Sequence, residues 1–231
     1  MTSTRKKNLP KIQNAVEKGH RLIVKLYLDR GIDVNIADED DRTPLYEAAY
    51  YGKDNVVALL ISEGANMYKK TDRDGWCALH AAAARGHDKV VKVLLENGCS
   101  PNVKNFDDKT PLFEAAHMGH MYIVKILVER GADIKIKTKS GGWTALHAAS
   151  TGGHTDIVKY LLDKGAFINA RSAEYKTSLY EACYWGHYQT AKLLLGKGAS
   201  TNARTKFGES VLDAATNKGH HDIVALLTQP K

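Results

Sequence analysis

Residues 43–52 read TPLYEAAYYG and residues 110–119 read TPLFEAAHMG, so one ten-residue pattern returns after 67 positions. A leucine marks this pattern along the chain at intervals of 34, 33, 34, 33 and 33 residues. The marker leucines are Leu45, Leu79, Leu112, Leu146, Leu179 and Leu212. Two series of glycines keep the same period, one from Gly19 to Gly219 and one from Gly31 to Gly198. Three markers with one period indicate tandem repeats.

Each repeat predicts two short helices. Thr43 can cap the first helix, and Pro44 suits its first turn. Gly52 ends that helix, because glycine adopts the left-handed conformation without a steric cost. The apolar run at 90–95 predicts a second helix, and the polar stretch at 69–74 predicts a hairpin-like loop to the next repeat.

The chain resembles the ankyrin repeat family, whose signature is a period of about 33 residues with the motif T-P-L-H-x-A. Leu-His-Ala-Ala stands at 79–82 and 146–149, while Thr-Pro-Leu precedes Tyr46 and Phe113. The likeness covers residues 8–228. It implies an all-α repeat solenoid of stacked helix-turn-helix repeats joined by short hairpin-like loops. It also implies that the chain binds other proteins rather than performing catalysis.

The likeness further implies a single domain over residues 1–231. We expect internal repeats at 38–70, 71–104, 105–137, 138–170 and 171–203. A capping repeat is expected at each end, at 8–37 and at 204–231. Polar residues such as Gln13, Lys18 and Asp213 favour polar outer faces on both caps, which a solenoid needs for solubility. We therefore expect a complete array.

The composition is that of a folded protein without a membrane span. Of 231 residues, 43% are hydrophobic and 26% are charged, which argues against general disorder. No stretch approaches the roughly 18 apolar residues that a membrane helix needs. The N-terminus has no apolar run of a secretory signal, and three cysteines do not make a disulfide framework. We expect a cytoplasmic location, with nuclear access as an alternative.

The net charge of +7 raises the question of nucleic acid as a partner. Basic residues are interleaved with acidic ones along the whole chain, which argues against a continuous basic face. The basic residues cluster only at Arg5, Lys6, Lys7 and Lys11. Binding of nucleic acid or acidic lipid through the basic surface therefore stays a secondary alternative, which a steep loss of affinity with salt would support.

The histidines and cysteines occupy repeat positions rather than a chemical site. His80 and His147 follow the marker leucine, and six further histidines follow the glycine at the end of a first helix. Periodic histidines lie one repeat apart, so we expect them not to converge on a metal ion. The chain has no phosphate-binding loop, zinc-protease motif or nucleophile elbow. We therefore expect no cofactor, no metal and no enzymatic activity.

The exposed face of the first helices predicts a partner-binding groove. Leu45, Ala48 and Ala49 share one helical face, and we expect Glu47, Tyr50 and Tyr51 to point the opposite way. Bulky repeats alternate with small-residue repeats that carry a loop tryptophan, and this alternation predicts pockets. The expected groove residues are Glu47, Tyr50, Tyr51, Trp76, Arg85, Phe106, Glu114, His117, Met118, Trp143, Glu181, Tyr184 and Trp185.

Aromatic walls beside glutamates favour a partner with Lys, Arg or aromatic anchors. The competing interpretation is that these side chains pack between repeats. We assign Tyr46, Phe113 and Tyr180 to packing, and the remaining aromatic groove residues to exposure and binding. Charged residues at the loop tips, such as Glu39 and Arg73, would add specificity.

The function that the sequence predicts is a monomeric, non-catalytic scaffold that binds a partner protein or peptide in its concave groove. A first alternative is a substrate-recruiting adaptor of a larger complex such as a ubiquitin ligase. The Leu-Tyr-Glu-Ala and Leu-Phe-Glu-Ala openings resemble those of ankyrin adaptors that carry an added ligase-docking box. No such box follows Leu227 in the sequence.

Overall fold

A computed structural model describes residues 11–229, which form helices, turns and one isolated bridge between Arg204 and Ser210. No strand occurs within that range, as the sequence predicts. The expected basic cluster at Arg5, Lys6 and Lys7 lies outside the described residues. Backbone contacts divide the chain into unit 1, Met1–Pro111 with Lys125–Ala132, and unit 2, Leu112–Val124 with Asp133–Lys231. The single domain and its repeat boundaries stay predictions.

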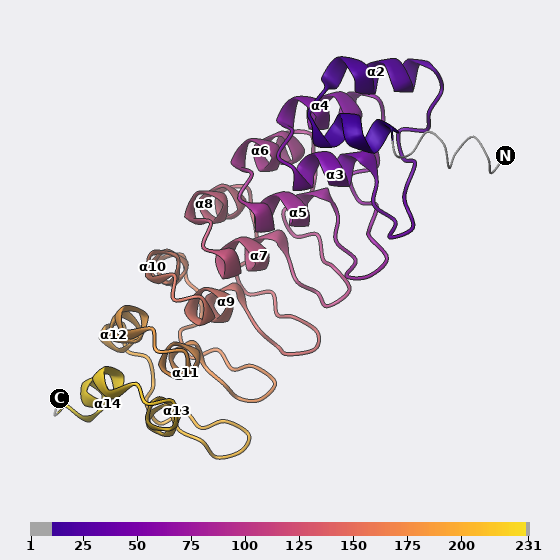
Figure 1. The fold of residues 1–231 in the computed structure, drawn as a ribbon. Coiled ribbons are helices and arrows are strands. Elements are labelled where there is room, and N and C mark those ends of the chain that lie inside the picture. The colour runs from indigo at the N-terminus through magenta and orange to yellow at the C-terminus, as the bar shows by residue number, and fades with distance from the viewer. Residues whose placement is uncertain (1–10, 230–231) are drawn as a thin grey trace. The chain divides into compact units, whose positions relative to one another are not determined.

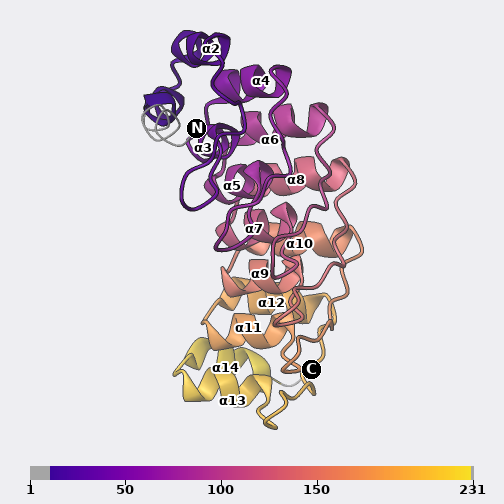
Figure 2. The same cartoon turned by 90° about the vertical axis from the view of Figure 1, so that its right-hand side faces the viewer.

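Unit 1 consists of paired helices in two layers (Figures 1 and 2). Its helices are α2 (Arg21–Asp29), α3 (Pro44–Tyr50), α4 (Asp54–Ser62), α5 (Ala78–Arg85) and α6 (Asp88–Glu96), and residues 11–17 are helical as well. The first helices α3 and α5 pack on each other, and so do the second helices α4 and α6. Helix α8 (Met121–Glu129) contributes residues to both units.

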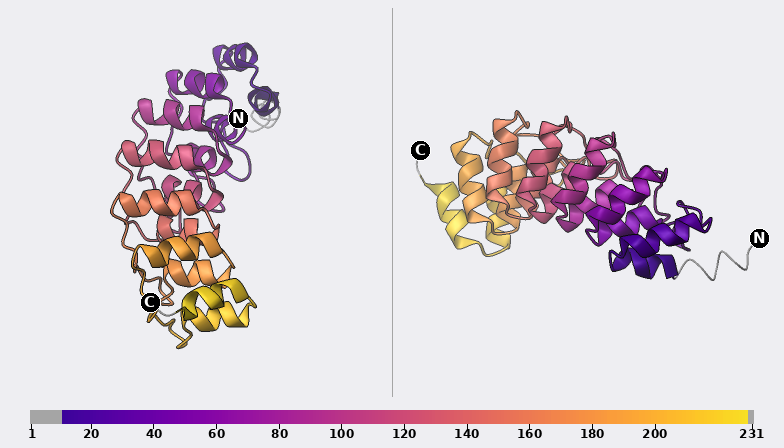
Figure 3. Two further views of the ribbon diagram at one scale, coloured as in Figure 1. Left: turned by 90° about the vertical axis from the view of Figure 1, so that its left-hand side faces the viewer. Right: turned by 90° about the horizontal axis from the view of Figure 1, so that it is seen from above.

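Unit 2 repeats the arrangement, with the orange and yellow pairs of Figure 3 at its C-terminal end. Its helices are α7 (Pro111–Met118), α9 (Ala145–Thr151), α10 (Thr155–Asp163), α11 (Ser178–Tyr184), α12 (Tyr188–Gly196), α13 (Val211–Asn217) and α14 (His221–Thr228). Helix α11 packs on α9, α12 and α13. Among the described residues, no helix is long and apolar enough to cross a membrane.

Side-chain caps start the first helices where the sequence places them. The Thr43 hydroxyl accepts a hydrogen bond from the Tyr46 amide at 3.2 Å, and Pro44 occupies the first turn. At α9, Thr144 and His147 form a reciprocal capping box. Such caps satisfy amides that have no partner within the helix.

Histidines of the Gly-His register tie neighbouring repeats together within each unit. His87 donates from Nε2 to the Tyr50 carbonyl at 2.9 Å, across 37 residues of sequence. Gly52 lies directly under this ring, and a Cβ there would stand 2.6 Å from His87 Nδ1. Gly52 also has φ +70°, so both backbone conformation and space require glycine.

Five of the six marker leucines lie in the core, because Leu45, Leu79, Leu112, Leu146 and Leu179 are buried while Leu212 is 38% exposed. The N-terminal cap differs from the expectation of a polar outer face, because α2 exposes Leu22 (79%), Ile23 and Leu26. The residue equivalent to Ile23 in α4, Val56, is fully buried because α2 packs against α4.

Candidate functional site

The C-terminal ends of the first helices form the candidate site, which we call the helix-end face. In unit 1 it comprises Tyr50, Tyr51 and Arg85. The Tyr50 ring stacks on Tyr46 with 6.3 Å between centroids, and it meets the exposed Tyr51 ring edge-on at 5.2 Å. The Arg85 guanidinium lies 4.6 Å from the Tyr50 centroid, so the chain supplies its own cation to this ring.

The same arrangement occurs in unit 2 around α11. Tyr184 stacks on Tyr180 at 6.0 Å and meets Trp185 edge-on at 5.2 Å. Lys218 stands one residue after the end of α13, in the register of Arg85, and its Nζ lies 4.4 Å from the Tyr184 centroid. Trp185 is 53% exposed. The end of α3 in unit 1 and the end of α11 in unit 2 thus each carry two aromatic rings that meet edge-on. In each pair a cation lies over the tyrosine ring.

The remaining helix-end residues of unit 2 come from α7 and α9. The His117 ring stacks on the buried Phe113 at 6.5 Å, and Met118 is 51% exposed. His154 donates to the His117 carbonyl at 3.0 Å, and His187 donates to the Thr151 carbonyl at 2.8 Å. These histidines hold the backbone beneath the face, which agrees with their predicted structural role.

The glutamates expected in the groove do not present their charge to solvent. Glu114 is 7% exposed and Glu181 is 3% exposed, while Glu47 lies half-buried 3.9 Å from Arg42. Burial raises the pKa of Glu47, which Arg42 opposes, and raises the pKa of Glu181, which Lys176 opposes. The expectation of acidic pockets therefore differs from the structure, because two of these carboxylates are buried and the third is half-buried near Arg42.

The loop tryptophans, which we expected to be exposed for binding, pack on buried histidines. Trp76 stacks on His80 at 6.3 Å, and Trp143 lies 6.0 Å from His147. Both tryptophans are half-buried, and both histidines are fully buried. Phe106 is exposed beside Lys70, whose Nζ lies 5.5 Å from its centroid.

Tyr46, Phe113 and Tyr180 lie in packed positions as predicted, with Tyr46 half-buried and the other two buried. The Tyr180 hydroxyl donates to Glu209 Oε2 at 2.6 Å. Within residues 11–229, no group of three or more His, Cys, Asp or Glu side chains could hold a metal ion. All three cysteines are free and buried.

Sequence reasoning missed Lys218 as a member of the helix-end face. Lys218 follows its marker leucine by six residues, as Arg85 does, and this shared register is the signal that could have found it. Reasoning from the helices also missed an exposed aromatic residue in a loop, Phe167.

Comparison with known proteins identifies the repeats. The family model "Ankyrin repeats (3 copies)" matches residues 12–105 and 101–172, and "Ankyrin repeats (many copies)" matches residues 179–228. The chain is 36% identical over 138 residues to Ankyrin repeat and SOCS box protein 3 of Homo sapiens, over 59% of this chain and 27% of that protein. It is 40% identical over 53 residues to Protein phosphatase 1 regulatory subunit 12A of Mus musculus, over 23% of this chain and 5% of that protein.

Among solved structures, the chain is similar to the crystal structure of the human ASB11 ankyrin repeat domain. The TM-score is 0.85 at 27% identity, over 95% of this chain and 98% of that domain. The similarity to Ankyrin repeat and SOCS box protein 3 spans about a quarter of that protein's length.

Proposed function

The chain belongs to the ankyrin repeat family, an all-α solenoid whose helix pairs form protein-binding surfaces, and on that premise we propose that it is a non-catalytic scaffold for a partner protein. The helix-end face of unit 2 is the surface we assign to this binding. Trp185 carries the proposal, because this exposed ring is held edge-on by Tyr184 and needs little ordering upon binding. Rigid aromatic residues of this kind are frequent interface hot spots.

The charges on the helix-end faces favour an acidic or aromatic partner segment over a basic one. Arg85 is exposed at the face of unit 1, and Lys218 is exposed at the face of unit 2. The glutamates that would attract Lys or Arg are buried or paired. A partner carboxylate beside an apolar anchor would complement a cation that already lies against a tyrosine ring.

The test compares partner capture by the unaltered chain and by Trp185→Ala, with quantification by mass spectrometry. A captured protein is then titrated against both chains, and we expect Trp185→Ala to weaken binding by ~1–4 kcal/mol. Phe207→Ala is the matched control, because Phe207 is 81% exposed in a loop away from the helix ends. Equal losses in both variants would contradict the assignment of this face.

A more specific candidate is a substrate-recruiting adaptor of a larger assembly such as a ubiquitin ligase. The similarity to Ankyrin repeat and SOCS box protein 3 favours it, as does the fold match to the ASB11 ankyrin repeat domain. Copurification of ligase subunits with the chain expressed in cells would support this role. Capture of a partner without any ligase subunit would favour the simple scaffold.

We extend the proposal to a monomeric protein in the cytoplasm with access to the nucleus. The free, buried thiols of Cys77, Cys99 and Cys183 are compatible with a reducing compartment. Cell fractionation tests the location, and light scattering of the purified chain tests the monomeric state. A molar mass equal to that of a dimer at all protein concentrations would contradict the monomeric state.

A further inference from the structure

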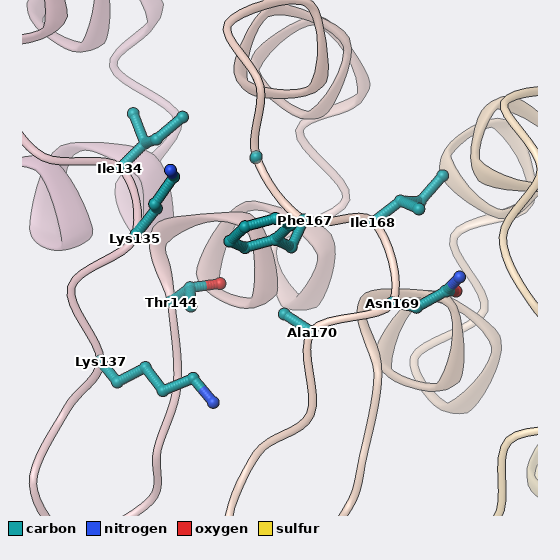
Figure 4. Close-up of a pocket in the computed structure, with 9 residues that line it drawn as sticks. Ile134, Lys135, Lys137, Thr144, Phe167, Ile168, Asn169 and Ala170 are labelled. Atoms are coloured by element: carbon teal, nitrogen blue, oxygen red, sulfur yellow. The ribbon is translucent and has the colours of Figure 1, made fainter.

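A pocket of about 560 Å³ opens within unit 2 between the segments 134–137 and 166–170. Figure 4 shows the Phe167 ring between these segments, with Ile134 and Ala170 on either side. Lys135 and Lys137 lie at the rim. The volume is in the range of pockets that bind ligands or anchor side chains.

The other repeats show what Phe167 replaces. At its register, five repeats carry a short polar side chain that accepts the amide two residues later, at 2.8 to 3.3 Å. These residues are Asp33, Asn66, Ser100, Asp133 and Ser200. Phenylalanine cannot accept this hydrogen bond, and it places a ring in solvent with 65% of its surface exposed. Phenylalanine at this position therefore removes a hydrogen bond that stabilises the local turn, and its ring is not buried against the rest of the chain.

A second replacement occurs at Lys135, across the pocket from Phe167. At this register Asn35 and Asn169 accept a backbone amide of the next repeat at 2.7 and 2.9 Å, and Asn102 donates to the Gly131 carbonyl at 3.0 Å. Lysine cannot accept an amide, and Lys135 Nζ lies instead 5.1 Å from the Phe167 centroid. The asparagine tie is therefore missing at this junction.

The junction remains connected further along the loop, where Lys137 donates to the Arg171 carbonyl at 3.0 Å. The two replacements thus leave a pocket between loops that stay side by side. Its lining is basic, because it includes the exposed cations of Lys135 and Lys137 and no carboxylate.

We propose that this pocket binds a short acidic segment of a partner protein, with one large apolar side chain against Phe167 and Ile134. Carboxylates flanking that side chain would pair with Lys135 and Lys137. None of these residues belongs to the helix-end face. The pocket and that face are therefore separate proposals, and either can fail alone.

The experiment measures fluorescence anisotropy of labelled hexapeptides with the full chain. The probe is Glu-Glu-Leu-Phe-Glu-Glu, and the two comparison peptides are Lys-Lys-Leu-Phe-Lys-Lys and Glu-Glu-Ser-Ser-Glu-Glu. We expect the acidic apolar peptide to bind at least about tenfold more tightly than either comparison peptide, and binding to weaken as salt rises. Failure of the probe to bind, or equal binding of the three peptides, would overturn the proposal.

Two variants restore what other repeats carry, Phe167→Asn and Lys135→Asn. Each is expected to reduce affinity for the probe about tenfold or more, while the melting temperature stays equal or rises because a repeat-type hydrogen bond becomes available. Phe207→Asn and Lys206→Asn remove the same side-chain types from the last loop and should leave affinity unchanged. Full affinity in Phe167→Asn with a native melting temperature would overturn the proposal. If Phe167→Asn melted early, the Lys135→Asn titration would decide by the same criterion.

Discussion

His87 donates to the carbonyl of Tyr50 at 2.9 Å, so the end of one first helix is held by the start of the second helix in the following repeat. The bond in unit 2 from His220 to Tyr184 has the same register, at 3.1 Å. Both tyrosines carry a cation on the ring face. The histidine that appears in the sequence as a repeat marker therefore positions the residues of the helix-end face.

Gly52→Ala tests this contact. A methyl group there meets the His87 ring, whereas Gly64 has nothing within 4 Å and a similar positive φ of +84°. We expect Gly64→Ala to cost ~1 kcal/mol from backbone strain, and Gly52→Ala to cost more, ~2–4 kcal/mol. Urea unfolding measures both variants. If both variants lost the same free energy of unfolding, the contact between the new methyl group and the His87 ring would not contribute to the destabilisation.

Leu112→Ala tests the shared core. Leu112 is 1% exposed, so its truncation should lower the free energy of unfolding by ~2–5 kcal/mol. Leu212 has the same register in the last repeat but is 38% exposed, and Leu212→Ala should cost distinctly less. Similar losses at both sites in thermal unfolding would contradict a core that weakens at its end.

The loop tryptophan and the helix-end tryptophan should respond differently. Trp143→Ala removes a half-buried ring from His147 and should lower stability by ~1–3 kcal/mol. Trp185→Ala removes an exposed ring and one hydrogen bond to the buried Glu181, and should lower stability by about 1 kcal/mol or less. Calorimetry of the two variants measures this difference. A large loss in Trp185→Ala would assign that ring to packing.

Stability should fall as the pH decreases from about 6.5 toward 4. Burial lowers the pKa of His80 and of His147 to about 4, so the unfolded chain binds protons that the folded chain excludes. Each histidine should contribute up to ~3 kcal/mol of this loss. Unfolding of His147→Gln across this pH range should show a shallower dependence than the parent chain. The exposed His221→Gln is the control, and equal slopes in all three would refute the expectation.

Glu181→Gln should raise stability near pH 7. Glu181 Oε1 is buried without a hydrogen-bond partner, and burial raises the pKa of this carboxyl. The folded state therefore loses stability as the pH rises above about 4.5, the ordinary pKa of a glutamate, toward the raised pKa of Glu181. A neutral amide avoids this loss of stability. We expect a gain of ~1 kcal/mol in urea unfolding at pH 7, and a smaller effect at pH 4. Glu47→Gln should show a smaller gain, because burial raises the pKa of this carboxyl as well but Glu47 is only half-buried and lies 3.9 Å from Arg42.

The sequence by itself determined the helix pairs, their caps and the buried leucines. These features depend on residues a few positions apart, such as Thr43 and Tyr46. They also recur with a regular period, which amino-acid composition alone does not produce. The packed positions of Phe113 and Tyr180 also followed from the register alone. For the same reason the family resemblance rested on local spacing.

Only the tertiary structure decided where charge and open space occur. Glu181 is buried although its position on the helix predicts exposure, and the cation that covers the Tyr184 ring comes from Lys218 of the neighbouring repeat, 34 residues away. The pocket at Phe167 likewise lies at the junction where Lys135 stands in place of an asparagine that ties other repeats together. Helical periodicity says which face a residue occupies, but the length and direction of the side chains across the junction determine what remains exposed there.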